Sequence, residues 1–365
     1  MNPGLRRAVL GALLLLLPRT IAAAPPGPGP QPLPPKEAAA PPEPKHEPDD
    51  WTRRVRVAGG IALYYYQPTN GWDNQFLVYS NLRFDAAYEG FGLHFEPRLS
   101  NEKMRPFYDG LAWIQEAYLY AGDDALRLKV GKIYKQVGLF WDNSFYGNIQ
   151  VYEGLKFDPG AGFSLEAKLG EKLGVNAFAQ FFVVDGHTNA SLVGRDTISI
   201  PGARRRNTLA ARLQPFAQLS RSARLELGFS GERFDAELPE ATHSVQRLAV
   251  DAKLSWGALG FWGEVLHQSG ANVNAHPLPG AASSDNTFLL AGVEYALAPL
   301  VFRYNLSLAR YSELSVDEVL HLPAIGIRFE EHVSFLAEYA LWHRYTPDGR
   351  SDVDESLNLT WLGHF

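Results

Sequence analysis

The sequence predicts a closed antiparallel β-barrel of about sixteen strands that crosses a membrane. Three observations predict this fold. Apolar and polar residues alternate along most of the chain, tight turns alternate with long polar loops, and the alternation continues to the last residue. A period of two places the two kinds of side chain on opposite faces of a strand. A ring of such strands turns an apolar face outward and a polar face inward.

The alternation begins near residue 54. Val55, Val57 and Ile61 share one parity, and Arg54 and Arg56 share the other. No long stretch after residue 51 has the 3.6-residue period of an amphipathic helix. Comparable segments begin near residues 54, 75, 90, 112, 125, 162, 173, 206, 223, 245, 258, 287, 300, 321, 332 and 355.

Every second connection between these segments is a tight turn, such as "GDDA", "GEK" or "ALAP". The other connections are longer, and they include residues 132–160, "DAELPEATHS", "YSELSVDEV" and "YTPDGRSDVD". This arrangement predicts a meander with two different ends. A soluble β-sandwich has fewer strands and turns its apolar faces toward each other. The strand number and the charged face favour a transmembrane barrel, whose closure also satisfies the backbone groups in hydrocarbon.

The sequence divides into three parts. Residues 1–23 read as a secretory signal peptide, with Arg6 and Arg7 before an apolar run that is too short to span a membrane. Residues 24–50 form a Pro-rich linker that we expect to be disordered. Residues 51–365 are the predicted barrel. The chain has no cysteine, so its stability must come from packing and backbone hydrogen bonds.

Composition and motifs exclude several classes of function. The net charge of −6 gives no basic excess that would indicate nucleic-acid binding. "GFSG" at 228–231 lies in a predicted strand and is not a nucleophile elbow. No histidines and carboxylates have the sequence spacing of a zinc motif. The sequence therefore predicts no enzyme, no cofactor and no metal site. The alternatives are an outer-membrane adhesin or a lipase-like enzyme that uses His267 with Ser269 or His321 with Ser307.

The last strand carries a pattern of its own. Leu357, Leu359, Trp361 and Phe365 lie on one parity at the end of the chain. This resembles the C-terminal β-signal of bacterial outer-membrane proteins, although Gly363 stands where that signal usually has a hydrophobic residue. The resemblance implies a bacterial outer-membrane location, recognition by the barrel-assembly machinery, and closure of the last strand against the first.

Residues 116–140, "EAYLYAGDDALRLKVGKIYKQVGLF", resemble the phosphate-selective porin family of the O and P type. The shared features are an aromatic strand, a tight turn, a basic "LRLRVG"-like strand and the start of a loop. The resemblance implies a sixteen-stranded porin, a passive channel for small polar or ionic solutes. It also implies a homotrimer and a loop after the fifth strand that folds inward and narrows the channel. The charged residues of this loop are Lys132, Lys135, Asp142, Glu153, Lys156 and Asp158.

The inward parity carries charges of both signs, which are candidates for lining a channel or for pairing with each other along its wall. The mixture leaves anion and cation selectivity open, with phosphate among the candidate solutes. "RRR" at 204–206 reads as a solvated strand end, as a contact for lipopolysaccharide phosphates or as a charge that draws in anions. Lipopolysaccharide and outer-membrane lipid are expected partners. The candidates are Arg56, Arg83, Arg98, Arg127, Lys129, Arg212, Arg224, Arg247, Lys253, Arg303 and Arg328, with Asp85, Glu96, Glu116 and Glu166.

Overall fold

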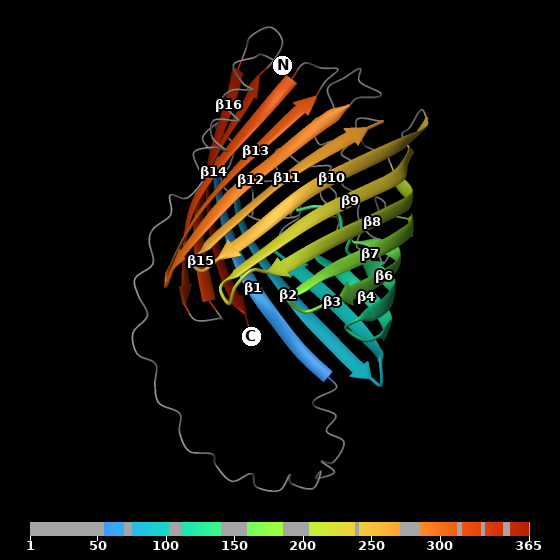
Figure 1. The fold of residues 1–365 in the computed structure, drawn as a ribbon. Helices are drawn as coiled ribbons and strands as arrows, with labels where there is room; N and C mark the ends of the chain where they lie inside the picture. Colours follow the sequence, from blue (N-terminus) through green and yellow to red (C-terminus); the bar gives the residue numbers. More distant parts are fainter. Residues whose placement is uncertain are drawn as a thin grey trace, which may run out of the picture. The chain divides into compact units, whose positions relative to one another are not determined.

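Sixteen antiparallel strands close into a barrel in the computed structural model (Figure 1). The model describes residues 55–68, 75–101, 111–139, 159–184, 204–237, 241–270, 285–311, 316–329, 333–345 and 351–364. Within these ranges, no helix is long and apolar enough to cross a membrane. The predicted signal peptide and linker lie outside them.

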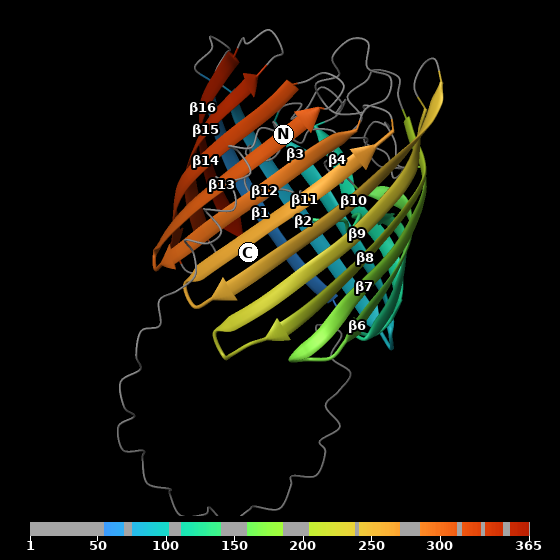
Figure 2. The ribbon, with the colours of Figure 1, turned by 45° about the horizontal axis from the view of Figure 1, so that its top comes forward.

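Each strand pairs with its neighbours in the chain, and Figure 2 shows the walls formed by β1–β4 and by β9–β13 on opposite sides of the ring. The strands are β1 (Val55–Pro68), β2 (Gln75–Tyr88), β3 (Phe91–Ser100), β4 (Ala112–Gly122), β5 (Leu126–Ile133), β6 (Gly160–Leu169), β7 (Leu173–Val184), β8 (Arg204–Gln218), β9 (Ala223–Glu237), β10 (Thr242–Trp256), β11 (Leu259–Ser269), β12 (Asn286–Leu297), β13 (Leu300–Tyr311), β14 (Val316–Phe329), β15 (Val333–Tyr345) and β16 (Ser351–His364).

The predicted fold class and strand number are confirmed, and every predicted strand start lies within five residues of the observed one. Three predicted loops are shorter than expected. The connections before β10, β14 and β16 span only 238–241, 312–315 and 346–350, because polar residues at both sides continue the strands. Asp317 of β14, for example, pairs with Arg310 of β13 and with Tyr345 of β15. Pairing with the neighbouring strands therefore extends these strand ends, although their sequence has no apolar alternation.

The ring closes between the first and last strands. Residues 356–364 of β16 pair with Pro68–Gly60 of β1, so the predicted closure is confirmed. Leu357, Leu359 and Trp361 share the outward parity, and Phe365 lies outside the described residues. The departure at Gly363 has a physical reason. A Cβ there would lie 2.9 Å from the Trp361 ring, so this indole already covers the space that a side chain at 363 would occupy.

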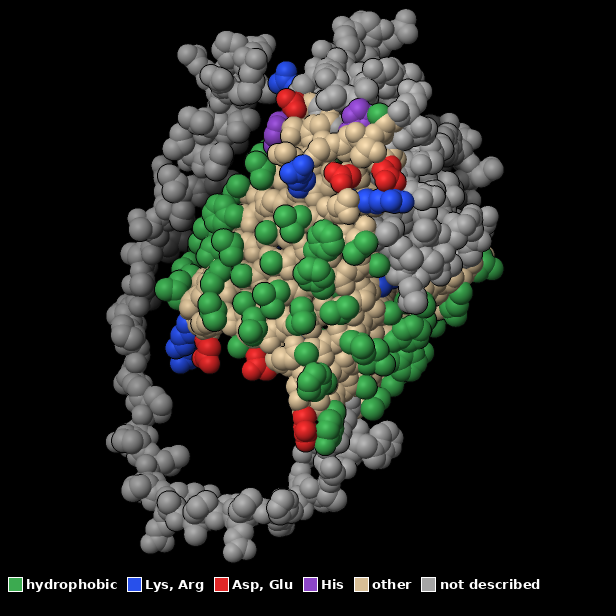
Figure 3. All heavy atoms as spheres, turned by 90° about the vertical axis from the view of Figure 1, so that its right-hand side faces the viewer, with side chains coloured by type: hydrophobic (Ala, Val, Ile, Leu, Met, Phe, Trp, Pro, Cys, Tyr) green, Lys and Arg blue, Asp and Glu red, His purple; other side chains and the backbone are tan. Residues whose placement is uncertain are grey.

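The outer face is apolar. Figure 3 shows hydrophobic side chains across one side of the barrel, with charged side chains near its two ends. Exposed residues of this face include Val57, Leu128, Phe229, Val265 and Ile325, from strands all around the ring. Because large exposed apolar areas are unfavourable in water, this band requires apolar surroundings of the kind a bilayer provides.

Tight turns join the strands at one end of the barrel. Glu89 and Gly90 both have positive φ angles, of 46° and 82°, which is the conformation of a type I′ hairpin turn. In the turn after β4, the N–H groups of Leu126 and Ala125 donate to the Asp123 carboxylate. These bonds hold the pKa of Asp123 below its ordinary value. Such local bonds fix the hairpin registers independently of the barrel interior.

If the outer apolar band faces lipid, the free-energy cost of a lysine substitution should depend on how deep the residue lies in the bilayer. Leu165 lies inside β6, and Leu169 ends the same strand on the same outer face. We expect Leu165→Lys to lower the free energy of unfolding in lipid vesicles by about 2–4 kcal/mol, and Leu169→Lys by about 0–1 kcal/mol. Denaturant titration followed by the gel mobility of folded and unfolded forms measures both. Equal small costs at the two positions would contradict a lipid-facing band.

Candidate functional site

The inner face of the barrel carries the charged residues. Strand register places all fifteen candidate lining residues on the parity opposite to the exposed apolar side chains. In the strand register, for example, Arg56 lies opposite Asp85, Arg127 opposite Glu166, and Arg303 opposite Glu294. The complete set is Arg56, Arg83, Arg98, Arg127, Lys129, Arg212, Arg224, Arg247, Lys253, Arg303, Arg328, Asp85, Glu96, Glu116 and Glu166.

Three inner carboxylates each lie between two guanidinium groups. Glu96 pairs with Arg98 at 2.6 Å and Arg83 at 3.5 Å. Glu294 pairs with Arg303 at 2.6 Å and Arg328 at 3.7 Å. Glu232 pairs with Arg205 and Arg247 at 3.3 and 3.1 Å. At Glu294 and Glu232, positive charge locally exceeds negative charge on the inner wall, whereas Glu96 also has the carboxylates of Asp85 and Glu116 nearby.

A buried polar cluster extends over β8–β11. Arg212 donates two parallel hydrogen bonds to Asp251, at 2.7 and 2.8 Å, and a third to Ser230. Both charged side chains are almost fully buried. Bidentate geometry and complete burial make this a strong pair whose members depend on each other.

Sequence reasoning misplaced the arginine run at 204–206. Arg205 is fully buried, pairs with Glu232 and stacks on Phe234, with its guanidinium carbon 4.0 Å from the ring centroid. It is therefore not a solvated strand end. Arg206 is partly exposed and pairs with Glu237. The register shift between Arg206 and Leu209 changes which parity points inward, so the alternation alone does not show that Arg205 is buried.

Along β9, the inner side chains become more buried away from the tight turns. The Arg224 side chain near the turn is 35% exposed, Glu226 is 23% exposed, and Glu232 further along the strand is fully buried. Near the same turns, Lys253, Trp262 and Glu294 contribute to a hollow of about 200 Å³ in the wall. The inner side chains of β9 are thus more accessible at the turn end of the barrel than toward the loop end.

The segment that follows β5, Tyr134–Leu139, runs along the inner wall. The Gln136 N–H donates to Gln180 of β7 at 2.7 Å, and the Gly138 N–H donates to Ser230 of β9 at 3.1 Å. The Leu139 N–H donates to Glu264 of β11. The start of this connection therefore extends from β5 along the inside of the barrel and contacts β7, β9 and β11.

The predicted constriction residues lie in three different environments. Lys132 belongs to β5 itself, and its ammonium donates to the Ile114 carbonyl at 2.5 Å. Lys135 is buried, with its ammonium 5.6 Å from the centre of the Phe182 ring. The remaining candidates, Asp142, Glu153, Lys156 and Asp158, lie outside the described residues, so the inward path of most of this loop stays a prediction.

Part of the inner face is apolar, which the sequence did not indicate. Val137 and Leu139 of the segment pack into a buried cluster on the inner side of β8–β15. In β14, both parities are apolar, so alternation gives no signal there. The cluster also contains Ala210, Ala249, Leu266, Phe288, Leu290, Ala309, Leu320, Leu322, Ala340 and Trp342.

The structure resembles solved bacterial outer-membrane proteins. It aligns with OmpF of Salmonella typhi in complex with daunomycin (TM-score 0.61, 10% identity, 85% of this chain and 97% of the other). It also aligns with the anion-selective porin of Comamonas acidovorans (0.60, 8%, 85% and 99%). A third match is the trimer form of OmpT, an outer membrane protein of Vibrio cholerae (0.56, 11%, 85% and 99%). Neither a protein-family model nor a curated protein matches the sequence.

These likenesses define a class of fold, the sixteen-strand barrel found in bacterial outer-membrane porins and channels. One catalytic pair weighed from the sequence does not form. His321 pairs with Leu306 on the outer face, and Ser307 lies on the inner face. His267 is also on the outer face, where its ring contacts Thr287 at 3.4 Å.

The buried pair of Arg212 and Asp251 predicts strong coupling. We expect Arg212→Met alone to lower the free energy of unfolding by about 3–5 kcal/mol, because it leaves the Asp251 carboxylate buried without its partner. Adding Asp251→Leu removes that charge, so we expect the double variant to be more stable than the single one. Denaturant titrations of the three proteins complete the cycle. A single variant as stable as the parent would contradict this account.

Proposed function

We propose that this protein is a porin of the bacterial outer membrane, a channel for the passive diffusion of small polar or ionic solutes without catalytic turnover. The observation that carries the proposal is the closed ring with an apolar outer band and a charged inner face. A wall of both charge signs orders water and admits polar solutes. The increasing burial of inner side chains along β9 and the hydrogen bonds of the segment at 134–139 support a constriction of the kind that a selective channel needs.

We infer a preference for anions. Glu294 faces the two guanidinium groups of Arg303 and Arg328, and Arg328 is about half exposed, as is Arg83 on β2. These exposed guanidiniums face the interior, where they raise the local concentration of anions. The likeness to an anion-selective porin agrees with this preference. Phosphate is the first anion to test, because residues 116–140 resemble the phosphate-selective porins.

The partners follow from the same proposal. Outer-membrane lipid covers the apolar band, and lipopolysaccharide surrounds the loop end. The barrel-assembly machinery recognises Leu357, Leu359, Trp361 and Phe365 of the last strand. We also propose that residues 1–23 are a signal peptide that directs export and that residues 24–50 are a Pro-rich linker. A homotrimer is supported by the trimer form of the similarly folded OmpT of Vibrio cholerae.

The proposal predicts a steady single-channel conductance in planar bilayers. In a salt gradient, the reversal potential should indicate anion preference, and Arg83→Ala combined with Arg328→Ala should move it toward cation preference. The exposed inner guanidiniums supply the field that the double variant removes. Arg310→Ala is a control, because Arg310 is exposed and lies near the loop end beside Asp317. A folded barrel without conductance would overturn the proposed function, and an unchanged reversal potential would overturn the anion preference.

If the segment at 134–139 limits the passage, a substitution that displaces it should change the single-channel conductance. Gly138 has a φ of 62°, and a Cβ there would stand 1.9 Å from a Glu264 carboxylate oxygen. We expect Gly138→Ala to push the segment from the wall and change the single-channel conductance. Gly257→Ala is the matched control, because Gly257 has a similar φ of 58° with no atom within 4 Å of its added Cβ. Equal conductance of the two variants would show that the segment does not limit the passage.

A further inference from the structure

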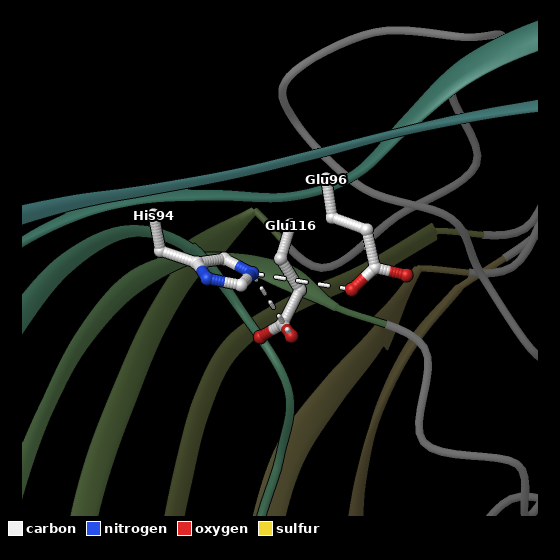
Figure 4. A group of neighbouring side chains, drawn as sticks. All are labelled: His94, Glu96 and Glu116. Atoms are coloured by element: carbon white, nitrogen blue, oxygen red, sulfur yellow. Dashed lines mark ion pairs between the residues drawn. The ribbon is translucent and has the colours of Figure 1, made fainter. Parts of the chain in front are cut away.

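Three potential metal ligands meet at an irregularity in the wall between β3 and β4. His94 and Glu96 lie two residues apart on β3, so both point to the inner face, and Glu116 lies opposite Glu96 on β4. The register shifts between Glu96 and Pro97, which leaves Gln115 as an extra residue on β4. Such bulges redirect side chains near functional sites. Figure 4 shows the His94 ring pointing toward both carboxylates.

Each of the three side chains also makes a polar contact with another neighbouring group. The Asp85 carboxylate lies 2.6 Å from Nδ1 of His94. Arg98 lies 2.6 Å from Oε1 of Glu96, and the Tyr134 N–H donates to Oε1 of Glu116 at 3.2 Å. In a neutral ring whose Nδ1–H donates a hydrogen bond to the Asp85 carboxylate, Nε2 of His94 presents a lone pair. A histidine ligand of a metal ion has the same arrangement, with a carboxylate on its other ring nitrogen.

The remaining ligand atoms converge on one point. Nε2 of His94 lies 3.9 Å from Oε2 of Glu96 and 3.9 Å from Oε2 of Glu116. His94 is only 6% exposed and Glu96 only 1%. Among the described residues, none makes a hydrogen bond to Nε2 of His94. A buried polar atom without a partner is costly, so its position calls for a ligand.

The charges around this point favour a cation. Asp85, Glu96 and Glu116 supply three carboxylates, and Arg83 and Arg98 supply two guanidiniums. Lys129, the next cation along the wall, is engaged by Glu166 at 2.8 Å. With a neutral His94, the group keeps one uncompensated negative charge. This is the only group of three potential ligands found in the described part of the chain.

We propose that His94, Glu96 and Glu116 bind a first-row divalent metal ion, for which Zn²⁺ is the best match. One imidazole nitrogen and two carboxylate oxygens are suitable donors for Zn²⁺, and water completes a four-coordinate site. Ligands at about 2.1 Å from the ion stand about 3.4 Å apart in a tetrahedral site. The observed 3.9 Å separations therefore need to close by only about half an ångström.

The bound ion would connect three parts of the barrel. His94 and Glu96 belong to β3, Glu116 belongs to β4, and Glu116 also accepts the N–H of Tyr134 at the start of the inner segment. The competing arrangement has no metal and a doubly protonated His94 between Asp85 and the two glutamates. Both arrangements satisfy the same oxygens, so the experiment must separate them.

The test uses full-length mature protein without a polyhistidine tag, in detergent and after treatment with a chelator. We expect one Zn²⁺ to bind per chain in calorimetry, and Co²⁺ to give the visible absorption of a four-coordinate site that Zn²⁺ then removes. His94→Gln and Glu116→Gln should abolish that absorption. Asp85→Asn should weaken binding by about 10–100-fold, because it removes only the carboxylate behind the histidine.

His267→Gln is the matched control, because it removes a histidine from the outer face. The gel mobility of unheated samples verifies that each variant is folded, and a higher melting temperature of the parent protein with Zn²⁺ gives a readout that needs no variant. Four outcomes would overturn the proposal: no Co²⁺ absorption, absorption that survives His94→Gln, equal loss in His267→Gln, or a doubly protonated His94 by nuclear magnetic resonance that Zn²⁺ does not displace.

Discussion

The structure depends on one constraint, the pairing of every strand with two neighbours. In hydrocarbon, unpaired backbone groups cost several kcal/mol each, and only a closed ring removes both edges of a sheet. The pairing of β1 with β16 completes that ring without any disulfide. Closure also decides which face of each strand meets the surroundings. A single alternation in the sequence therefore produces both an apolar exterior and a charged interior.

The interior uses its charges in two ways. Around β8–β11, they are buried in mutual pairs such as Arg212 with Asp251, which hold the wall and its inner segment in place. Near the tight turns, Arg83 and Arg328 stay exposed beside carboxylates that are already shared with Arg98 and Arg303. In the first region, ion pairing offsets the desolvation cost of the buried charges. In the second region, the charges stay in contact with solvent, which screens them. In the proposed channel, the exposed region is the one that we expect to act on solutes.

The sequence predicted the ring and the two faces well, because a period of two is a local property that each strand repeats. It did not predict where a bulge changes the inward parity. The register shift between Arg206 and Leu209 turns Arg205 inward, where it is fully buried, and leaves Arg206 partly exposed on the opposite face. The sequence also missed the inner apolar cluster, since Leu320 and Leu322 lie in a strand with apolar residues on both parities. Both features depend on how strands pair and pack with one another, which a pattern within one strand does not record.

The group around His94 shows the same limit and its consequence. Glu96 and Glu116 are twenty residues apart, and only the shift of register between β3 and β4 brings them together. Two carboxylates that face each other in a paired position repel unless a cation lies between them. Arg98 and Arg83 lie 2.6 and 3.5 Å from the two oxygens of Glu96, but no guanidinium of the described residues pairs with Glu116. The bulge between β3 and β4 thus lies beside a concentration of negative charge at the start of the inner segment 134–139, where the proposed ion would act on both the wall and the segment.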